Sequence, residues 1–289
     1  MLEQARLIDW STLQFHLMWI YEGPPSHTGK VVNRESEYYA LWLVRRGSAR
    51  ITGERGVRVA EAGQWMVREL GPCSQEFSED AEILSVNFKL AWPTGQHFLD
   101  VRQSLVLEAE AFPRLERTAL PLLKQVNRTI GQAGLLLPGQ RVDIHLFLAT
   151  QARFIRWMEA FTDAAVNAGV SPTRLGLADE RVIKAANLLE RWPLDRPFDQ
   201  SELERETGLT IQHLDRLFAK ECQTTPGRYF DLRRLEQAKL RLATTSSSIK
   251  EIAYQLGFNS QSHFARWFGK RQKATPKDYR QHSQLIYRK

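Results

Sequence analysis

Short apolar and alternating segments occupy the first hundred or so positions of the chain. They lie at 38–44, 49–51, 57–59, 65–67 and 84–88. Glycines such as Gly47 and Gly63 stand between neighbouring segments. Short strands divided by glycine-containing turns at intervals of about 8–12 residues are typical of an antiparallel barrel or sandwich, and we expect one here.

Helical spacing replaces this alternation after Pro113. Apolar residues recur at helical intervals over 115–130, and a second apolar stripe runs through about 141–168. Such a stripe packs against its own domain or forms a dimer interface, and the pattern is compatible with both. Glycine, serine and proline then gather at 169–178, which predicts a linker.

From position 179 onward, helix signals follow one another almost to the end of the chain. Asp179 and Asp199 are candidate N-caps, whose side chains accept hydrogen bonds from the first free N–H groups of a helix. Thr225-Pro226 predicts the start of a longer helix, and Ser248 with an acidic residue three positions later forms a capping box. The predicted helices begin near 179, 199, 210, 226, 248, 260 and 276.

This C-terminal region repeats itself at a spacing of 50 residues. Positions 213–229 share seven of 17 residues with positions 263–279. Each unit consists of a short helix, a glycine turn, a second helix and a proline-started helix. A short helix joined to a second helix by a tight turn makes a helix-turn-helix, which presents its second helix to the DNA major groove.

The second helices of the two units have equivalent outer faces. Apolar residues at i, i+3 and i+4 point into the core, which leaves the opposite face for DNA. The candidates for base readout there are Gln212, Arg216, Gln261, Ser262 and Arg266. The candidates for phosphate contacts are His213, Lys220, His263 and Lys270. Arginine pairs with guanine and glutamine with adenine, each through two hydrogen bonds. Ordinary surface arginines would also fit, but recurrence in both units favours base readout.

The stretch 249–268, closed by Thr275-Pro276 and Tyr279-Arg280, resembles the signature of AraC/XylS transcription regulators. The resemblance covers about 180–281. It implies a first helix-turn-helix at 199–221, a joining helix at 226–243 in which Arg233 or Arg234 matches the family pattern, and a second helix-turn-helix at 248–271. It further implies that both recognition helices enter adjacent major grooves on one face of DNA.

Two features depart from the family pattern. Glu204 stands where the first unit usually has a small residue, as Ala253 is in the second unit. We expect this change to affect packing of the first unit. Gly269 and Lys273 replace a usual lysine and glycine after the second recognition helix. We expect that change to alter a phosphate contact or the following turn.

The charge distribution agrees with nucleic-acid binding. The chain has 289 residues and a formal charge of +7. Residues 179–289 hold 21 Lys or Arg and 14 Asp or Glu, whereas the preceding residues hold 19 of each kind. A basic portion beside a neutral one is typical of a polyanion-binding module, although a solvated basic surface would have the same composition.

The N-terminal pattern resembles, more loosely, the cupin-type sensor domain that precedes this DNA-binding module. Catalytic metal cupins bind their metal through an HxH pair, a Glu and a later His, but the seven histidines form no such pair. We therefore expect no metal and no cofactor. The many aromatic residues before position 169 either fill a core or line an effector pocket. Arg45, Arg46 and Arg50 suit either an anionic ligand or a charged surface.

These observations predict an α+β protein. Its parts are a cupin-like antiparallel β-barrel with helices at 1–168 (helical part about 113–168), a linker at 169–178 and an all-α DNA-binding domain at 179–289. The expected function is a sequence-specific DNA-binding transcription regulator, and not an enzyme, that responds to a small-molecule effector. The alternative is a metal-cupin enzyme with a DNA-binding tail. The missing metal ligands, and the absence of GxSxG, P-loop and HExxH motifs, argue against it.

The expected partners follow from this function. They are double-stranded DNA, a small-molecule effector, a second copy of the chain as a homodimer, and RNA polymerase. No apolar stretch of about 18 residues occurs, so we expect no membrane contact. Two cysteines 149 residues apart and an N-terminus without signal-peptide character favour the cytoplasm.

Overall fold

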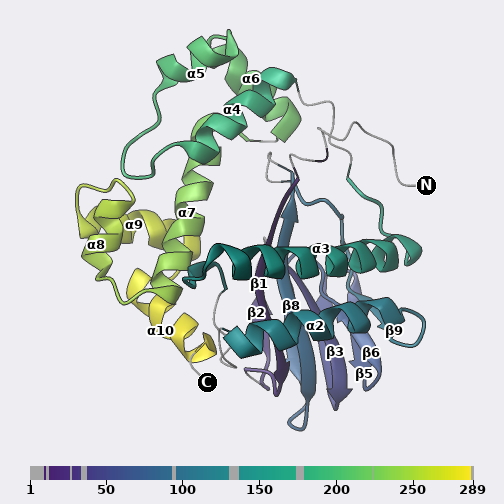
Figure 1. Cartoon of the computed structure of the whole chain (residues 1–289). Coiled ribbons are helices and arrows are strands. Elements are labelled where there is room, and N and C mark those ends of the chain that lie inside the picture. The colour runs from purple at the N-terminus through teal and green to yellow at the C-terminus, as the bar shows by residue number, and fades with distance from the viewer. Residues whose placement is uncertain are drawn as a thin grey trace.

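The computed structural model describes residues 10, 13–26, 28–33, 38–92, 96–129, 137–173, 179–222 and 224–287. Within these residues, two antiparallel sheets and two α-helices are followed by seven further helices (Figure 1). This arrangement confirms the α+β class expected from the sequence. Residues 174–178 of the expected linker lie outside the described residues, so the domain boundaries stay a prediction.

The N-terminal part contains a five-stranded sheet with order β1-β8-β3-β6-β9 and a four-stranded sheet with order β2-β7-β4-β5. Every pair of neighbouring strands is antiparallel. The strands are β1 (Gln14–Gly23), β2 (Val31–Asn33), β3 (Tyr39–Arg46), β4 (Ser48–Gly53), β5 (Gly56–Glu61), β6 (Gln64–Val67), β7 (Cys73–Phe77), β8 (Glu82–Ala91) and β9 (Leu105–Glu108).

Strand β3 is covered on both faces. Six consecutive residues at its start are buried, because successive side chains of a strand point to opposite faces and both faces meet apolar partners. Leu41 belongs to the core shared with helices α2 (Pro113–Thr129) and α3 (Ile144–Asn167), whereas Trp42 belongs to the core between the two sheets. The five-stranded sheet is thus the middle layer of the N-terminal part.

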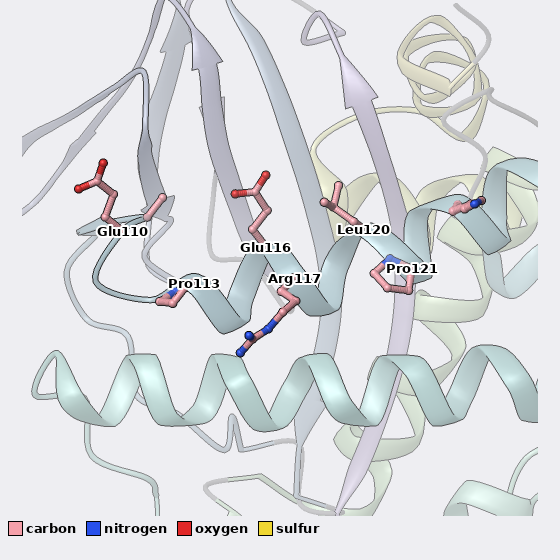
Figure 2. A pocket seen from close by; sticks show the side chains of 8 residues that line it. Glu110, Pro113, Glu116, Arg117, Leu120 and Pro121 are labelled. Carbon is pink, nitrogen blue, oxygen red and sulfur yellow. The ribbon is translucent and has the colours of Figure 1, made fainter.

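Helices α2 and α3 run side by side in opposite directions across this sheet (Figure 1). Near one end, Arg114 Nη1 lies 2.8 Å from Asp163 Oδ2, and near the other, Gln125 Nε2 donates to Thr150 Oγ1 at 3.0 Å. An open groove of about 800 Å³ lies on the outside of α2 (Figure 2). It is lined by Ala109, Glu110, Pro113, Glu116, Arg117, Leu120, Pro121 and Lys124.

The C-terminal helices begin where the sequence predicts. They are α4 (Glu180–Arg191), α5 (Gln200–Thr207), α6 (Ile211–Cys222), α7 (Pro226–Thr244), α8 (Ile249–Gln255), α9 (Gln261–Gln272) and α10 (Pro276–Tyr287). Asp179, Asp199 and Thr225 each accept a hydrogen bond from a backbone N–H of the helix that follows. Ser248 and Glu251 form the expected capping box. No helix in the described ranges is long and apolar enough to cross a membrane.

Two equivalent cores hold these helices together, and α7 contributes to both. Tyr229 packs in the first core at 6.0 Å from Phe218, measured between ring centroids, in an edge-to-face arrangement. Tyr279 packs at the second core in the same arrangement, 5.4 Å from Phe268. Leu194, between α4 and α5, packs against both cores. The sequence repeat is therefore a repeat of packing.

Candidate nucleic-acid interface

Helices α6 and α9 show the same burial pattern at equivalent positions. Leu214 and Phe218 of α6 are fully buried, as are Phe264 and Phe268 of α9. Leu217 and Trp267 pack against the same cores, whereas Arg216 and Arg266 lie on the opposite, exposed face of their helices. The predicted DNA contacts Gln212, His213, Arg216, Lys220, Gln261, Ser262, His263, Arg266 and Lys270 are all exposed. The structure thus brings them onto two matched faces, while their roles toward DNA stay predictions.

The two arginines at the centres of these faces are available for a ligand. Among the described residues, neither Arg216 nor Arg266 has an ion-pair partner. The exposed Lys220 Nζ lies 3.9 Å from Glu221 Oε1, near the limit for an ion pair, so this contact holds the lysine only weakly. A guanidinium that is exposed and unpaired keeps all its donors for base edges or phosphates.

Each unit turns on a glycine in the left-handed region. Gly208 has φ +68° and Gly257 has φ +74°, a conformation that residues with a Cβ rarely adopt. A Cβ on Gly257 would also lie 2.8 Å from the carbonyl of Asp195 and 3.0 Å from the oxygen of Leu194. The loop between α4 and α5 therefore rests directly on the turn of the second unit.

Glu204 has a local role that its position in the sequence did not reveal. Its Oε1 accepts a hydrogen bond from the N–H of Ile211, the first residue of α6, at 2.6 Å. The neighbouring Leu203 is fully buried in the first core, so the larger side chain does not prevent packing of this unit. The carboxylate instead ties α5 to the start of the first recognition helix.

The second departure from the family pattern leaves the turn intact. Lys273 ends α9 with φ +52° and donates its N–H to the Gly269 carbonyl at 2.8 Å. It is the sole residue other than glycine with positive φ in the described ranges. The left-handed conformation destabilises a residue with a Cβ, such as lysine, by about 1–2 kcal/mol relative to glycine. The turn is therefore kept at some cost in stability.

Adjacent arginines on α7 tie α4 and the second unit to this joining helix. Arg233 Nη1 donates to the carbonyls of Leu189 and Trp192 at the end of α4, both at 2.6 Å. Arg234 Nε donates to the carbonyl of Leu256 at the end of α8, at 2.9 Å. The sequence left open which of the two arginines matches the family pattern, and the structure uses both. Each satisfies C-terminal carbonyls that a helix leaves without partners.

Aromatic contacts and a carboxylate complete the second junction. The Arg234 guanidinium lies 4.2 Å from the ring centroid of Phe258, and that of Arg271 lies 4.6 Å from the ring of Trp267. Asp231 on α7 pairs with Arg271 at 2.5 Å. These stacked cations hold the second recognition helix at a set position on α7.

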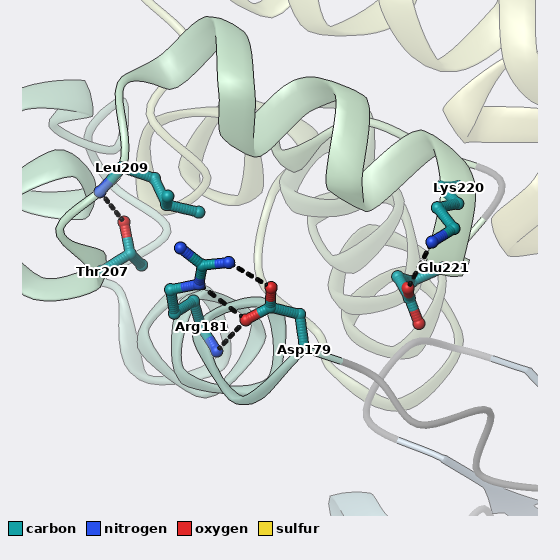
Figure 3. A network of polar contacts seen from close by, with 6 residues as sticks. All are labelled: Asp179, Arg181, Thr207, Leu209, Lys220 and Glu221. Atoms are coloured by element: carbon teal, nitrogen blue, oxygen red, sulfur yellow. Dashed lines mark hydrogen bonds and ion pairs between the residues drawn. The ribbon is translucent and has the colours of Figure 1, made fainter.

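The start of α4 is held by an ion pair beside the first unit (Figure 3). The Asp179 carboxylate accepts from Arg181 N at 3.0 Å and from Arg181 Nε at 2.8 Å. The hydrogen bond from the Arg181 side chain lowers the pKa of Asp179 to about 2. The cap is therefore ionised at neutral pH, as a helix N-terminus favours.

Two of the arginines considered for an anionic ligand are engaged elsewhere. Arg45 pairs with Glu22 at 2.8 Å and with Glu116 at 2.5 Å. Arg46 pairs with Glu82 at 3.1 Å. Both therefore belong to surface ion pairs of the N-terminal part, in agreement with the charged-surface interpretation.

Comparison with known proteins places this double unit in a family. A helix-turn-helix domain model matches residues 203–282. Regulatory protein SoxS of Salmonella typhimurium is 36% identical over 87 residues, which cover 30% of this chain and 81% of SoxS. The transcriptional regulator GlxA of Rhizobium meliloti is 32% identical over 120 residues, 42% of this chain and 37% of GlxA. The chain belongs to the AraC/XylS family of transcription regulators. As a member of this family it is a DNA-binding transcription regulator.

A likeness in fold to two solved structures extends over nearly the whole chain. The crystal structure of a single-residue variant of ToxT from Vibrio cholerae, in its apo form, matches 93% of this chain and 97% of its own, with a TM-score of 0.50 and 14% identity. A second structure, of ToxT with an unsaturated fatty acid bound, matches 92% of this chain and 94% of its own, with a TM-score of 0.50 and 13% identity. At these identities the likeness concerns the fold alone, an antiparallel N-terminal part followed by the helical DNA-binding units.

Proposed function

We propose that this AraC/XylS regulator reads DNA with α6 and α9 together, one major groove for each helix. Bases would be read by Gln212, Arg216, Gln261, Ser262 and Arg266, and phosphates contacted by His213, Lys220, His263 and Lys270. This proposal rests mainly on the match between the two helices. In each of them, two buried apolar residues face the core, and the predicted DNA contacts lie exposed on the opposite face. A helix-turn-helix contacts bases through the exposed residues of its second helix.

The operator should reflect this duplication. Duplex fragments selected by the purified full chain from a random pool are expected to show two short blocks, about 10 base pairs apart for each chain. Hydroxyl-radical footprinting on the selected duplex should protect both blocks on one face of the helix. Protection of a single block of five or six base pairs would contradict the proposal that both helices bind.

A small-molecule effector fits the polar side chains between the two sheets. Ser85 and Asn87 of β8 pair in register with Trp42 and Ala40 of β3, so they face the core between the sheets. Asn87 is 4% exposed, and its Oδ1 has no hydrogen-bond partner among the described residues. A buried polar atom of this kind is costly unless something satisfies it. We propose that a polar group of the effector does so.

The contact between the N-terminal part and α7 supports a route for the signal. The Tyr38 hydroxyl donates to Glu236 Oε2 on α7 at 3.0 Å. The Tyr38 carbonyl accepts from Nη2 of Arg68, a buried residue that follows β6, at 3.2 Å. A change in the surroundings of Arg68 would therefore reach the helix that joins the two DNA-binding units. On this proposal the chain acts in the cytoplasm, where bacterial DNA lies, and without catalysis.

The exposed face of α3 supports the proposed homodimer. Ile144, Phe147, Leu148 and Ile155 are 61%, 46%, 56% and 48% exposed. They share one face of the helix and form a stripe about 16 Å long, in which Gln151 lies between Leu148 and Ile155. Contiguous apolar surface on a folded protein marks an interaction site. We propose that two copies pair through this stripe.

Charge on the stripe should separate the two copies. The double variant Leu148→Glu/Ile155→Glu is expected to convert the dimer into a monomer, because two carboxylates would be buried without partners at the interface. Sedimentation velocity of the full chain measures this. Val57→Glu is the control, since Val57 is 45% exposed on β5, away from α3, and its replacement should leave the dimer unchanged. A monomeric wild-type chain, or a dimer that persists in the double variant, would refute the stripe as the interface.

A further inference from the structure

The two recognition helices differ at their N-termini. In α6 the N–H of Ile211 is taken by the Glu204 carboxylate at 2.6 Å. In α9 no described residue accepts from the N–H groups of Gln261 and Ser262, the first two residues of the helix. The Glu204 carboxylate thus occupies the N-terminus of α6, whereas the first two N–H groups of α9 have no acceptor among the described residues.

Three local features account for this difference. Ala253 occupies the position in α8 that corresponds to Glu204 in α5, so the second unit has no carboxylate to offer. Ser260 caps α9 by accepting from the N–H of His263 at 3.1 Å. The equivalent hydrogen bond in α6, from the N–H of His213 to Thr210 Oγ1, is 3.4 Å long and therefore weaker. Glu204 provides the shorter hydrogen bond at the start of α6, at 2.6 Å.

A carboxylate in this position has an electrostatic consequence for DNA binding. A helix N-terminus carries a partial positive charge and exposed N–H groups, and phosphates bind there readily. Such contacts position a protein on the DNA backbone without reading sequence. The Glu204 carboxylate uses one donor, offsets the positive end of α6 and repels a phosphate that approaches it. The start of α9 has no comparable anion among the described residues.

We propose that Glu204 weakens the grip of the first helix-turn-helix unit on DNA phosphates and makes the second unit the stronger anchor. This inference rests on the proposed insertion of both helices into DNA. It gives Glu204 two linked effects: it stabilises the start of α6, and it lowers the affinity of α6 for the DNA backbone.

The variant Glu204→Gln separates these two effects, because Gln keeps an oxygen that accepts from Ile211 but has no charge. We expect the full-length variant to bind both its selected duplex and an unrelated duplex of equal length about two- to fivefold more tightly. The gain should shrink as salt rises, since exposed charges are screened. Glu202→Gln is the matched control. It removes the same charge from the same helix, but its side chain points about 200° around the helix from Glu204 and lies 3.9 Å from Arg205.

A reciprocal variant tests the effect of a carboxylate on the second unit. It also provides a test if Glu204→Gln does not fold. Ser260→Asp places a carboxylate at the start of α9, where Asp is as good a cap as Ser. It should lower affinity for both duplexes about two- to fivefold relative to Ser260→Asn, which adds no charge. The inference is overturned if folded Glu204→Gln gains no affinity, if Glu202→Gln gains equally, or if Ser260→Asp binds as tightly as Ser260→Asn.

These outcomes are distinct from failure of the proposed function. If Arg216→Ala remains folded and loses no affinity, α6 does not bind DNA as proposed and the functional proposal itself is wrong. If Arg216→Ala loses affinity but Glu204→Gln gains none, α6 binds DNA and only the role of Glu204 is wrong.

Discussion

Replacing Gly257 by alanine is expected to destabilise the DNA-binding part by about 2–5 kcal/mol. An alanine at φ +74° costs about 1–2 kcal/mol, and the new Cβ would lie 2.8 Å from the Asp195 backbone. Relieving that overlap requires the α4–α5 loop to move away from the second unit, at a further cost of about 1–3 kcal/mol. Urea unfolding of the full chain followed by far-ultraviolet circular dichroism measures the loss.

The internal repeat provides a matched control for this variant. Gly208 has nearly the same backbone conformation, with φ +68°, but a Cβ there would meet nothing within 4 Å. Gly208→Ala should therefore lower the free energy of unfolding by only about 1–2 kcal/mol, the cost of the left-handed backbone conformation for alanine. Equal losses for the two variants would contradict the close contact between the loop and the second turn.

The C-terminal helices could be predicted because their signals are local. Asp179, Asp199 and Thr225 cap the helices that follow them, as the sequence suggests. The 50-residue repeat then showed that two such sets of helices form equivalent units. A capping side chain contacts a backbone group within a few positions, so its effect is visible without knowledge of the tertiary structure.

Four strands of the N-terminal part escaped prediction for physical reasons. In β1 a register shift between Leu17 and Trp19 interrupts the alternation on which such predictions depend. In β7 the inward positions include the polar Gln75, so burial does not follow hydrophobicity. Strands β2 and β9 have only three and four residues, too few for a pattern to emerge.

For the candidate site, the sequence predicted the exposed faces but not what holds them in place. Helical spacing was enough to put Arg216 and Arg266 opposite buried apolar residues. The hydrogen bonds of Arg234 to Leu256 and of Glu204 to Ile211 depend on how separate helices meet. A one-dimensional pattern contains no such information, and Glu204 was visible in the sequence only as a departure from the family.

The variant Arg266→Ala is expected to lose about 1–3 kcal/mol of DNA-binding free energy, or roughly five- to 150-fold in affinity, on the selected duplex. Arg266 is exposed and without an ion-pair partner in the described ranges, so its replacement breaks no ion pair there. The loss should exceed that of Arg216→Ala, because Glu204 weakens the first unit. Fluorescence anisotropy titrations at fixed salt provide the comparison. A larger loss for Arg216→Ala would reverse this ranking.

Lys270→Ala is the contrasting variant in the same helix. A phosphate contact contains no base information, so its loss should weaken binding to selected and unrelated duplexes alike. The salt dependence should also become shallower by about 0.9 in the slope of log affinity against log salt. Loss on the selected duplex alone would instead place Lys270 among the base-reading residues.

Whether α6 and α9 each read one block is tested most directly by how Arg216→Ala and Arg266→Ala discriminate among single-base variants of the two operator blocks. If α6 and α9 each read one block, each variant loses discrimination at its own block and keeps it at the other. Circular dichroism must first show that both variants are folded. If folded Arg266→Ala loses neither affinity nor discrimination at either block, α9 is not a recognition helix and the two helices do not read DNA together.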